Sequence, residues 1–286
     1  MIVPRFTKSE IMANLRAKVA ARKPLFIASA GSGLVAQLLE KAGADCINTF
    51  PGARLRANGM GTMAMLWPIL DSNKQTIEYT EEDILPALKG KSFVCACLNA
   101  NDPLRDMRSV LERLKMMGVP SVSNIGPSIS YVDKDSQIRK VLNKSGITFE
   151  NEIEMLKLGN ELDMVTIALA FDVEDSIQIV KEAQPDIFCF HAGTTKGGLK
   201  GFDSGETIEE TAKRTEEVNV MVRELKSDIL LIAHGAAMET PEDAEYILHN
   251  TTCDGIWTGS STERLPIERA VLGAAQEFAN IKFADS

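Results

Sequence analysis

Two histidines, His191 and His234, are the side chains best suited to acid–base chemistry, and each follows directly on an apolar run, "DIFCF" and "LLIA". An imidazole changes charge near neutral pH, so two of them side by side can serve as proton donor and proton acceptor. A metal pair is the alternative. Because transition-metal sites generally need a third ligand, that ligand would have to come from Asp172, Asp102 or Cys189. The pair predicts proton transfer, and the metal remains open.

The stretch "TGSS", with Gly259, Ser260 and Ser261, is a second chemical candidate. Together with Gly235 in "HGAA", it supplies small residues that let an anion approach backbone N–H groups at the start of a helix. The two serine hydroxyls can add hydrogen bonds. We expect a phosphate or carboxylate site here. In the alternative, Ser261 or Thr262 only caps the last helix.

Other polar residues also stand where apolar runs end, and we take them as substrate-facing candidates: Ser29, Gly31, Asn48, Asn99, Asn124 and Asp172. The asparagines are expected to orient substrate oxygens, Asn99, Asn124 and Asp172 to belong to the catalytic set, and Ser29, Gly31 and Asn48 to contact substrate. For each of them alone, a helix cap or a turn residue is the plainer interpretation.

Two long glycine-containing loops carry basic residues that suit an anionic substrate. Arg54 and Arg56 lie in the first loop, and Lys196 and Lys200 lie in the second, between Gly193 and Gly205. Arg54 and Lys196 are taken as binding candidates. Such loops either close over the substrate and exclude water or are solvated loops with no role.

The elements that must position these residues are eight short β-rich runs separated by helical stretches. The runs begin at Pro24, Asp45, Lys91, Val119, Asp163, Pro185, Asp228 and Cys253. They are almost continuously apolar, which indicates burial on both faces, as parallel sheets require. The pattern predicts an α/β fold, a (β/α)8 TIM barrel. It forms a single domain over residues 1–286, with an extra N-terminal helix in 1–23 and the barrel in 24–286. The chemistry of such barrels lies at the carboxyl ends of the strands, so the candidates share one mouth.

Helix start and stop signals support this order. Thr7 and Glu10 form a capping pattern, Thr240 and Pro241 mark another helix start, and a helix is predicted from Asp102 to Gly118. An insertion of about 35 residues, from Gly52 to about Leu88, interrupts the alternation after the second strand.

Composition narrows the class of protein. The net charge of -9 disfavours nucleic acid as a partner, and no apolar run reaches the ~20 residues that cross a bilayer. The five cysteines lie in or beside apolar runs without C-x-x-C spacing, which is typical of buried thiols in a reducing compartment. We expect a cytoplasmic protein that binds no nucleic acid and no membrane.

The last predicted helix, "ERLPIERAVLGAAQEFANI", carries an apolar stripe. Its members are Ile267, Ala270, Val271, Ala274 and Phe278, with Leu272 and Ala275 beside them. The stripe either packs on the barrel or joins two copies of the chain, and we expect a homo-oligomer.

Several strings of this chain resemble the phosphoenolpyruvate hydrolase-like, or phosphonopyruvate hydrolase-like, TIM-barrel family. They run in order from about Arg5 to Ala279: "AGSGLVAQLLEKAGAD", "NGMGTMAMLWPILDSN", "NDPLRDM", "ELDMVTIALAF", "HGAAMETPEDAEYIL" and "TGSSTERLPIE". A looser resemblance to the phosphoenolpyruvate mutase and isocitrate lyase superfamily implies a small 2-oxo acid or enol phosphate substrate with magnesium. Those enzymes hold magnesium with clustered carboxylates, whereas this chain offers Asn99, Asn124 and Asp102 near the corresponding strand ends.

The sequence therefore predicts an enzyme that acts on a small anionic metabolite, a 2-oxo acid or phosphorylated enol, by hydrolysis or lyase-type cleavage with histidine acid–base chemistry. The cofactor is unknown. Magnesium is the candidate, with Asp102 and Asp172 as its candidate ligands. The alternative is a non-catalytic barrel that senses or scaffolds through a bound phosphate compound.

Overall fold

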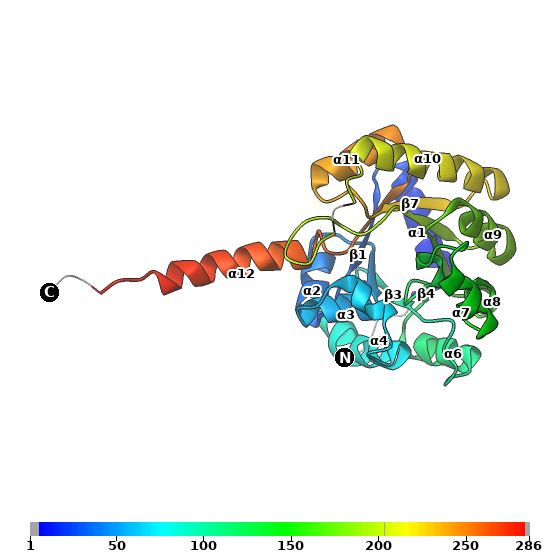
Figure 1. The fold of residues 1–286 in the computed structure, drawn as a ribbon, viewed down its shortest axis with the longest axis horizontal. Helices are drawn as coiled ribbons and strands as arrows, with labels where there is room; N and C mark the ends of the chain where they lie inside the picture. Colours follow the sequence, from blue (N-terminus) through cyan, green and yellow to red (C-terminus); the bar gives the residue numbers. More distant parts are fainter. Residues whose placement is uncertain (1–5, 203, 284–286) are drawn as a thin grey trace.

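Eight parallel strands close into a barrel in strict sequence order, β1 to β8, so the predicted fold is confirmed (Figure 1). The computed structural model describes residues 6–202 and 204–283. Residues 1–5, at the start of the predicted leading segment, lie outside the described residues. The strands are β1 (Leu25–Ser29), β2 (Cys46–Thr49), β3 (Phe93–Cys97), β4 (Ser121–Ser123), β5 (Val165–Ala170), β6 (Ile187–His191), β7 (Leu230–His234) and β8 (Gly255–Thr258).

Helices follow the strands and surround the barrel, as the alternation of apolar runs and helix signals predicts. They are α1 (Lys8–Ala20), α2 (Gly33–Lys41), α3 (Pro51–Ala57), α4 (Ser72–Tyr79), α5 (Leu85–Ala87), α6 (Met107–Met117), α7 (Gln137–Lys144), α8 (Phe149–Glu161), α9 (Val173–Ala183), α10 (Ile208–Leu225), α11 (Pro241–Asn250) and α12 (Arg264–Ala279). The insertion after β2 folds into α3, a 3-10 turn η1 (Thr62–Leu66), α4, a π-helical turn η2 (Thr80–Ile84) and α5. A second 3-10 turn, η3 (Ile129–Tyr131), follows β4.

The core forms two layers because successive strand residues point to opposite faces. In β1, Ile27 belongs to the cluster that fills the barrel interior, whereas its neighbour Ala28 packs in the outer layer beneath the helices. Ile11 and Leu15 of α1 join the interior cluster together with Leu25 at the start of β1. The leading helix thus closes the amino end of the barrel, and the opposite end stays available for a site.

Local signals placed most helix starts correctly. Thr7 with Glu10 and Thr240 with Asp243 both form complete capping boxes. The predicted start of α6 at Asp102 is wrong, because the helix begins at Met107 with Asp106 as its N-cap. Asp102 instead accepts a hydrogen bond from the Leu104 N–H, which holds residues 102–106 in a turn ahead of the helix.

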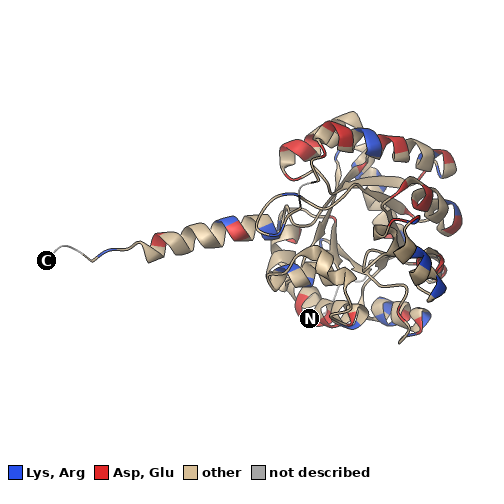
Figure 2. Ribbon diagram, viewed as in Figure 1, with Lys and Arg blue, Asp and Glu red and all other residues tan. Residues whose placement is uncertain are grey.

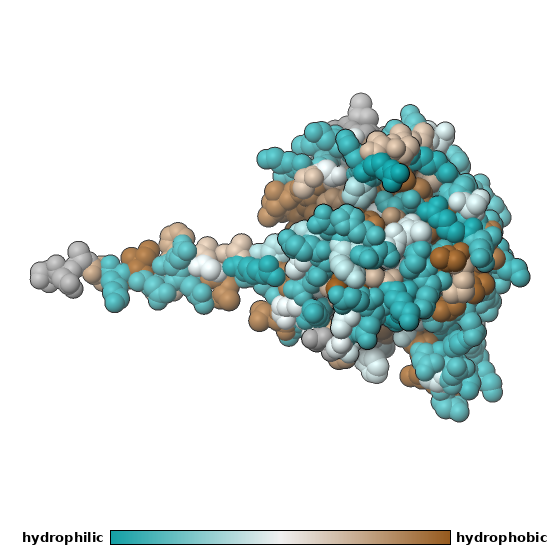
Figure 3. Space-filling model, turned by 90° about the horizontal axis from the view of Figure 1, so that it is seen from above, coloured by the Kyte–Doolittle hydropathy of each residue, from teal (hydrophilic) through white to brown (hydrophobic). Residues whose placement is uncertain are grey.

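The last helix, α12, leaves the barrel and projects away from it (Figure 1). Only Arg264 and Leu265, in its first turn, are buried, while Val271 and Phe278 are 63% and 76% exposed. Figure 3 shows hydrophobic patches along this projecting helix. The alternative in which the stripe packs on its own barrel is therefore wrong. The predicted helix cap is also absent, since Glu263 is the N-cap residue and makes no side-chain capping hydrogen bond. The Thr262 hydroxyl pairs instead with Thr258 at 2.7 Å.

Charged residues lie mainly on the helices (Figure 2), as expected when both faces of a parallel sheet are buried. Four of the five cysteines are buried and Cys253 is partly buried, and all five are free thiols. Among the helices of the described residues, none is long and apolar enough to pass through a bilayer.

Candidate functional site

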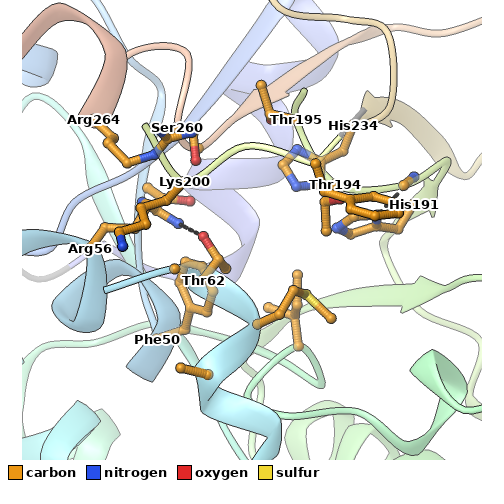
Figure 4. A pocket seen from close by; sticks show the side chains of 18 of the residues that line it. Phe50, Arg56, Thr62, His191, Thr194, Thr195, Lys200, His234, Ser260 and Arg264 are labelled. Carbon is orange, nitrogen blue, oxygen red and sulfur yellow. Dashed lines mark hydrogen bonds between the residues drawn. The ribbon is translucent and has the colours of Figure 1, made fainter. Parts of the chain in front are cut away.

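A cavity of about 510 Å³ opens at the carboxyl end of the barrel. Its lining comes from strand ends, from the insertion after β2 and from the loop after β6 (Figure 4). The side chains that bear on its chemistry are Ser29, Phe50, Arg56, Thr62, Met63, Ile125, Tyr131, His191, Thr194, Lys200, Phe202, His234, Trp257, Ser260 and Arg264. This is the size of pocket that takes small organic ligands, ~300–1,000 Å³.

The two predicted histidines lie together in this cavity. His191 ends β6 and pairs in register with His234, which ends β7. Their rings meet edge to face with centroids 4.5 Å apart. The parallel register therefore brings the two imidazoles into contact, as their positions at the ends of neighbouring strands predict.

Hydrogen bonds fix a different tautomer for each ring. His234 Nδ1 lies 2.6 Å from the Trp257 carbonyl oxygen, an acceptor, so Nδ1 carries the proton and Nε2 keeps a lone pair. The Gly193 N–H donates to His191 Nδ1 at 3.2 Å, which leaves the proton of His191 on Nε2. Nε2 of His191 lies 3.4 Å from the Tyr131 hydroxyl. One imidazole is thus an acceptor and the other is a donor.

Burial keeps both imidazoles neutral. Loss of hydration, with a contribution from the nearby Arg56 guanidinium, outweighs the hydrogen bond to Trp257 and lowers the pKa of His234 to about 4. Burial, followed by repulsion from His234, lowers the pKa of His191 well below its usual range. At pH 7 both rings are therefore uncharged before a ligand binds, and each is free to accept or donate a hydrogen bond or proton.

Tyr131 extends the imidazole end of the cavity. It stands in η3, its ring lies 3.6 Å from that of Phe171, and burial raises the pKa of its hydroxyl, which therefore stays protonated. The turn that carries it is held by Glu152, which accepts from the Ser128 hydroxyl at 2.7 Å and from the Ile129 N–H at 2.7 Å. Sequence reasoning missed Tyr131 because its pattern, "SISY", gives no sign that the ring faces the mouth.

Three basic side chains form a cationic wall on the other side of the cavity: Arg56, Lys200 and Arg264 (Figure 4). Arg56 is buried against Glu263, with nitrogen and oxygen atoms 2.5 Å apart, and also donates to the Thr62 hydroxyl at 3.2 Å. The remaining oxygen of Glu263 accepts from the Gly31 N–H at 2.6 Å.

Arg264 ties the loop after β6 to α12. It donates to the Gly197 carbonyl at 2.7 Å and pairs with Glu268 at 3.0 Å. Lys200 is exposed, and no ion pair joins it to another residue within the described part of the chain. With Glu263 and Glu268 against three cations, the wall keeps a surplus positive charge, which suits one anionic group.

Only part of the predicted phosphate or carboxylate site belongs to the cavity. Gly259 and Ser260 line the cavity, whereas Ser261 and Gly235 do not. A Cβ atom at Gly259 would stand 3.7 Å from His234 Cε1 and 3.8 Å from Arg56 Nη1, so this glycine faces the space between the imidazoles and the cationic wall. Gly235 has φ +89° and touches the Gly193 backbone, which gives it a structural role in the turn after β7.

Two further binding candidates, Ser29 and Asn48, share the Trp257 indole, but only Ser29 lines the cavity. Ser29 accepts from Trp257 Nε1 at 3.2 Å. Asn48 accepts from the same indole at 3.1 Å and donates to Cys97 Sγ at 2.8 Å. The N–H of the third candidate, Gly31, is already bonded to Glu263.

The remaining candidates lie outside the cavity and have structural partners. Asn124 bonds both backbone groups of Leu169, and Asp172 caps α9. Asn99 is hydrogen-bonded to Asn73, and Asp102 and Arg54 form ion pairs with Arg105 and Asp83. Lys196 does not line the cavity.

Three comparisons place the chain among known proteins. A family model described as phosphoenolpyruvate hydrolase-like matches residues 10–281. The ToMV susceptible protein tm-1(GCR26) of Solanum lycopersicum is 30% identical over 272 residues, which are 95% of this chain and 35% of the tomato protein. The chain thus spans about a third of the length of that relative.

Solved structures share the fold at low sequence identity. Phosphonopyruvate hydrolase in complex with oxalate and Mg²⁺ superposes with a TM-score of 0.61 at 16% identity, covering 96% of this chain and 87% of that one. Oxaloacetate acetylhydrolase in complex with the inhibitor 3,3-difluorooxalacetate gives 0.59 at 11% identity, covering 96% and 87%. The structures show the fold, and the match of the family model over nearly the whole chain shows that it belongs to the phosphoenolpyruvate hydrolase-like family.

Proposed function

We propose that this barrel is an enzyme that cleaves a bond close to the 2-oxo group of a small 2-oxo acid, or the ester bond of a phosphorylated enol, by lyase-type or hydrolytic chemistry. One observation carries the proposal. The carboxyl end of the TIM barrel, where enzymes of this fold carry their active sites, has a cavity with a neutral imidazole acceptor, a neutral imidazole donor and, opposite them, a cationic wall.

We propose a separate role for each side of the cavity. The cationic wall of Arg56, Lys200 and Arg264, with the Ser260 hydroxyl, would hold the carboxylate or phosphate. His234 Nε2 would accept a proton from a substrate hydroxyl as the adjacent bond breaks, and return it to the enolate carbon that results. A water molecule in place of the hydroxyl gives the hydrolytic variant. His191 Nε2–H would donate a hydrogen bond to the oxygen that gains negative charge.

The low pKa of His234 is compatible with this role. In the ligand-free site the ring is unprotonated at neutral pH, as a base must be. A bound anion favours the charged form of a nearby imidazole and so brings the pKa of His234 back towards neutrality. The base therefore becomes stronger when substrate is present.

The residues at this site do not fit magnesium. Magnesium prefers oxygen ligands in octahedral geometry, commonly carboxylates. Within residues 6–202 and 204–283, neither Asp nor Glu contributes to the cavity lining, and no group of three or more His, Cys, Asp or Glu side chains could hold a metal. Asp102 is engaged by Arg105 and Asn73, and Asp172 caps a helix.

The names of similar proteins support a small 2-oxo acid or phosphorylated enol as the substrate. Phosphonopyruvate hydrolase and oxaloacetate acetylhydrolase are named for small 2-oxo acids, and the family description names phosphoenolpyruvate. The proposal is tested by assaying the purified chain against phosphoenolpyruvate, phosphonopyruvate and oxaloacetate, with the variants His191→Asn and His234→Asn. Turnover of one of these compounds that falls ~100-fold or more in both variants supports the proposal. Unchanged turnover in both variants removes the histidines from the chemistry.

A ligand-binding sensor is the second candidate. It is favoured by one observation: the tomato relative is named for virus susceptibility and not for a reaction, and this chain covers 35% of it. A sensor needs the cationic wall but not the imidazole pair. Calorimetric binding of a phosphate compound, without turnover across the whole panel, would support this candidate against the enzyme.

A further inference from the structure

The cavity has two chemically different sides, and part of its lining is apolar. The cationic wall and the imidazole pair stand on opposite sides (Figure 4). Besides hydroxyl side chains, the lining includes four large apolar side chains, Phe50, Met63, Ile125 and Phe202. A ligand that meets both ends must lie against these groups.

The apolar part of the lining limits the chemistry of the ligand's body, meaning the part of the ligand beyond its anionic group. The described residues place no Asp, Glu, Asn or Gln in the lining, so the side-chain partners are hydroxyls, imidazoles and cations. The Arg56 guanidinium lies over the Phe50 ring, so Phe50 belongs to the cationic side. A second carboxylate that met Met63 and Ile125 would give up water without a new cationic partner, which is unfavourable. An alkyl or aromatic body gains free energy from the same contact.

Size leads to the same conclusion. The cavity of about 510 Å³ corresponds to the volume of roughly 17 water molecules at ~30 Å³ each. A three-carbon acid occupies only a small part of it. Phe202 lines the cavity and is 68% exposed, so a large ring is presented to solvent at the point where a ligand body would cover it.

We propose that the ligand of this site is a monoanionic organic acid with an apolar body, an alkyl or aromatic 2-oxo acid larger than pyruvate, and that Phe202 covers that body. This inference rests on the proposed function, because it takes the 2-oxo acid head group from there. It departs from that function in requiring the body of the substrate to be apolar and not a second acidic group.

The test is calorimetric titration of the whole chain with pyruvate, 2-oxobutanoate, 4-methyl-2-oxopentanoate and phenylpyruvate. Affinity should rise about fourfold for each added methylene, the factor expected when one CH₂ is buried. Oxaloacetate is the polar counterpart of 4-methyl-2-oxopentanoate, with the same shape and a second carboxylate. It should bind at least ~10-fold more weakly than that compound.

The variant Phe202→Ser tests the position of the body. Its side chain is exposed, so the fold should be unaffected, whereas affinity for phenylpyruvate should fall about 10-fold and affinity for pyruvate should stay within about twofold. Leu199→Ser is the matched control. Leu199 is an apolar residue of the same loop, 79% exposed, and does not line the cavity, so its loss should change neither affinity.

The outcomes distinguish a failure of this inference from a failure of the proposed function. Binding of pyruvate and oxaloacetate with no gain from an apolar body overturns the inference and leaves the proposed function standing. Equal effects of Phe202→Ser and Leu199→Ser also overturn it. Failure of every 2-oxo acid to bind overturns the proposed function and the inference together.

Discussion

Gly259→Val should block the cavity at its centre while leaving the barrel stable. Gly259 is not among the residues with positive φ, and a Cβ atom there would meet His234 Cε1 at 3.7 Å and the Arg56 guanidinium nitrogens at 3.8 and 3.9 Å, all ordinary contacts. The two methyl groups of valine extend a further ~1.5 Å beyond Cβ, into the space between the imidazole pair and the cationic wall.

The size of the effect follows from what the ligand loses. A ligand that spans both sides must give up at least one hydrogen bond to a charged group, which contributes about 1.5–3 kcal/mol. Affinity for the bound anion should therefore fall about 10- to 150-fold. Because the added atoms face a cavity and not packed side chains, the melting temperature should change by less than about 4 °C.

Calorimetry with the best-binding 2-oxo acid and thermal unfolding of the same preparation measure both quantities. Gly235→Ala is the matched control, since φ is +89° there and the new Cβ atom would lie 2.0 Å from the Gly193 carbonyl oxygen. It should lower the melting temperature clearly more than Gly259→Val does. If Gly259→Val lowers stability and affinity together, or leaves affinity unchanged, Gly259 does not face the ligand and the reasoning fails.

Three further predictions follow from the same contacts. The pKa of His234 is lowered to about 4 in the folded chain from an ordinary value near 6.5, so the unfolded chain binds the proton first as pH falls. The contribution of neutral His234 to stability is therefore complete above pH 6.5 and is lost towards pH 4. His234→Asn should flatten the pH dependence of the unfolding free energy in that window, and an unchanged curve would contradict the burial argument. Arg56→Met leaves Glu263 buried without its partner and should destabilise the fold by about 3–5 kcal/mol. The double variant Arg56→Met/Glu263→Met should recover much of the stability but not the anion binding. If the double variant binds the anion normally, Arg56 is not part of the anion site. The exposed apolar stripe of α12 should pair with a second copy of the chain, so light scattering at micromolar concentration should give at least twice the chain mass of 31.2 kDa, and a monomer mass would refute it.

The parts of the fold that depend on local sequence were predictable. The eight strands are nearly continuous apolar runs, and Thr7 and Thr240 mark their helices because capping is decided by residues three positions apart. The contact between His191 and His234 was predictable too, because neighbouring parallel strands end side by side. Asp106, and not Asp102, caps α6, since two aspartates near one start offer alternatives that sequence alone does not decide.

The rest of the site depends on distant contacts and on side-chain direction. Asn124 follows a strand end as His191 does, yet it bonds the backbone of Leu169, 45 residues further along the chain. Arg56 and Glu263 lie 207 positions apart in the sequence, so no local pattern predicts their pairing. For α12 the apolar stripe is the same whether it meets its own barrel or another copy, and only the direction of the helix distinguishes the two.

The central claim is that the imidazole pair moves protons on a bound organic acid, and proton NMR in D₂O measures this directly. A 2-oxo acid that calorimetry shows to bind should lose the signal of the protons next to its carbonyl in the presence of the chain. The rate should fall ~100-fold or more in His234→Asn while binding persists. Binding without exchange in the unmodified chain, or exchange at the same rate in His234→Asn, would contradict the account.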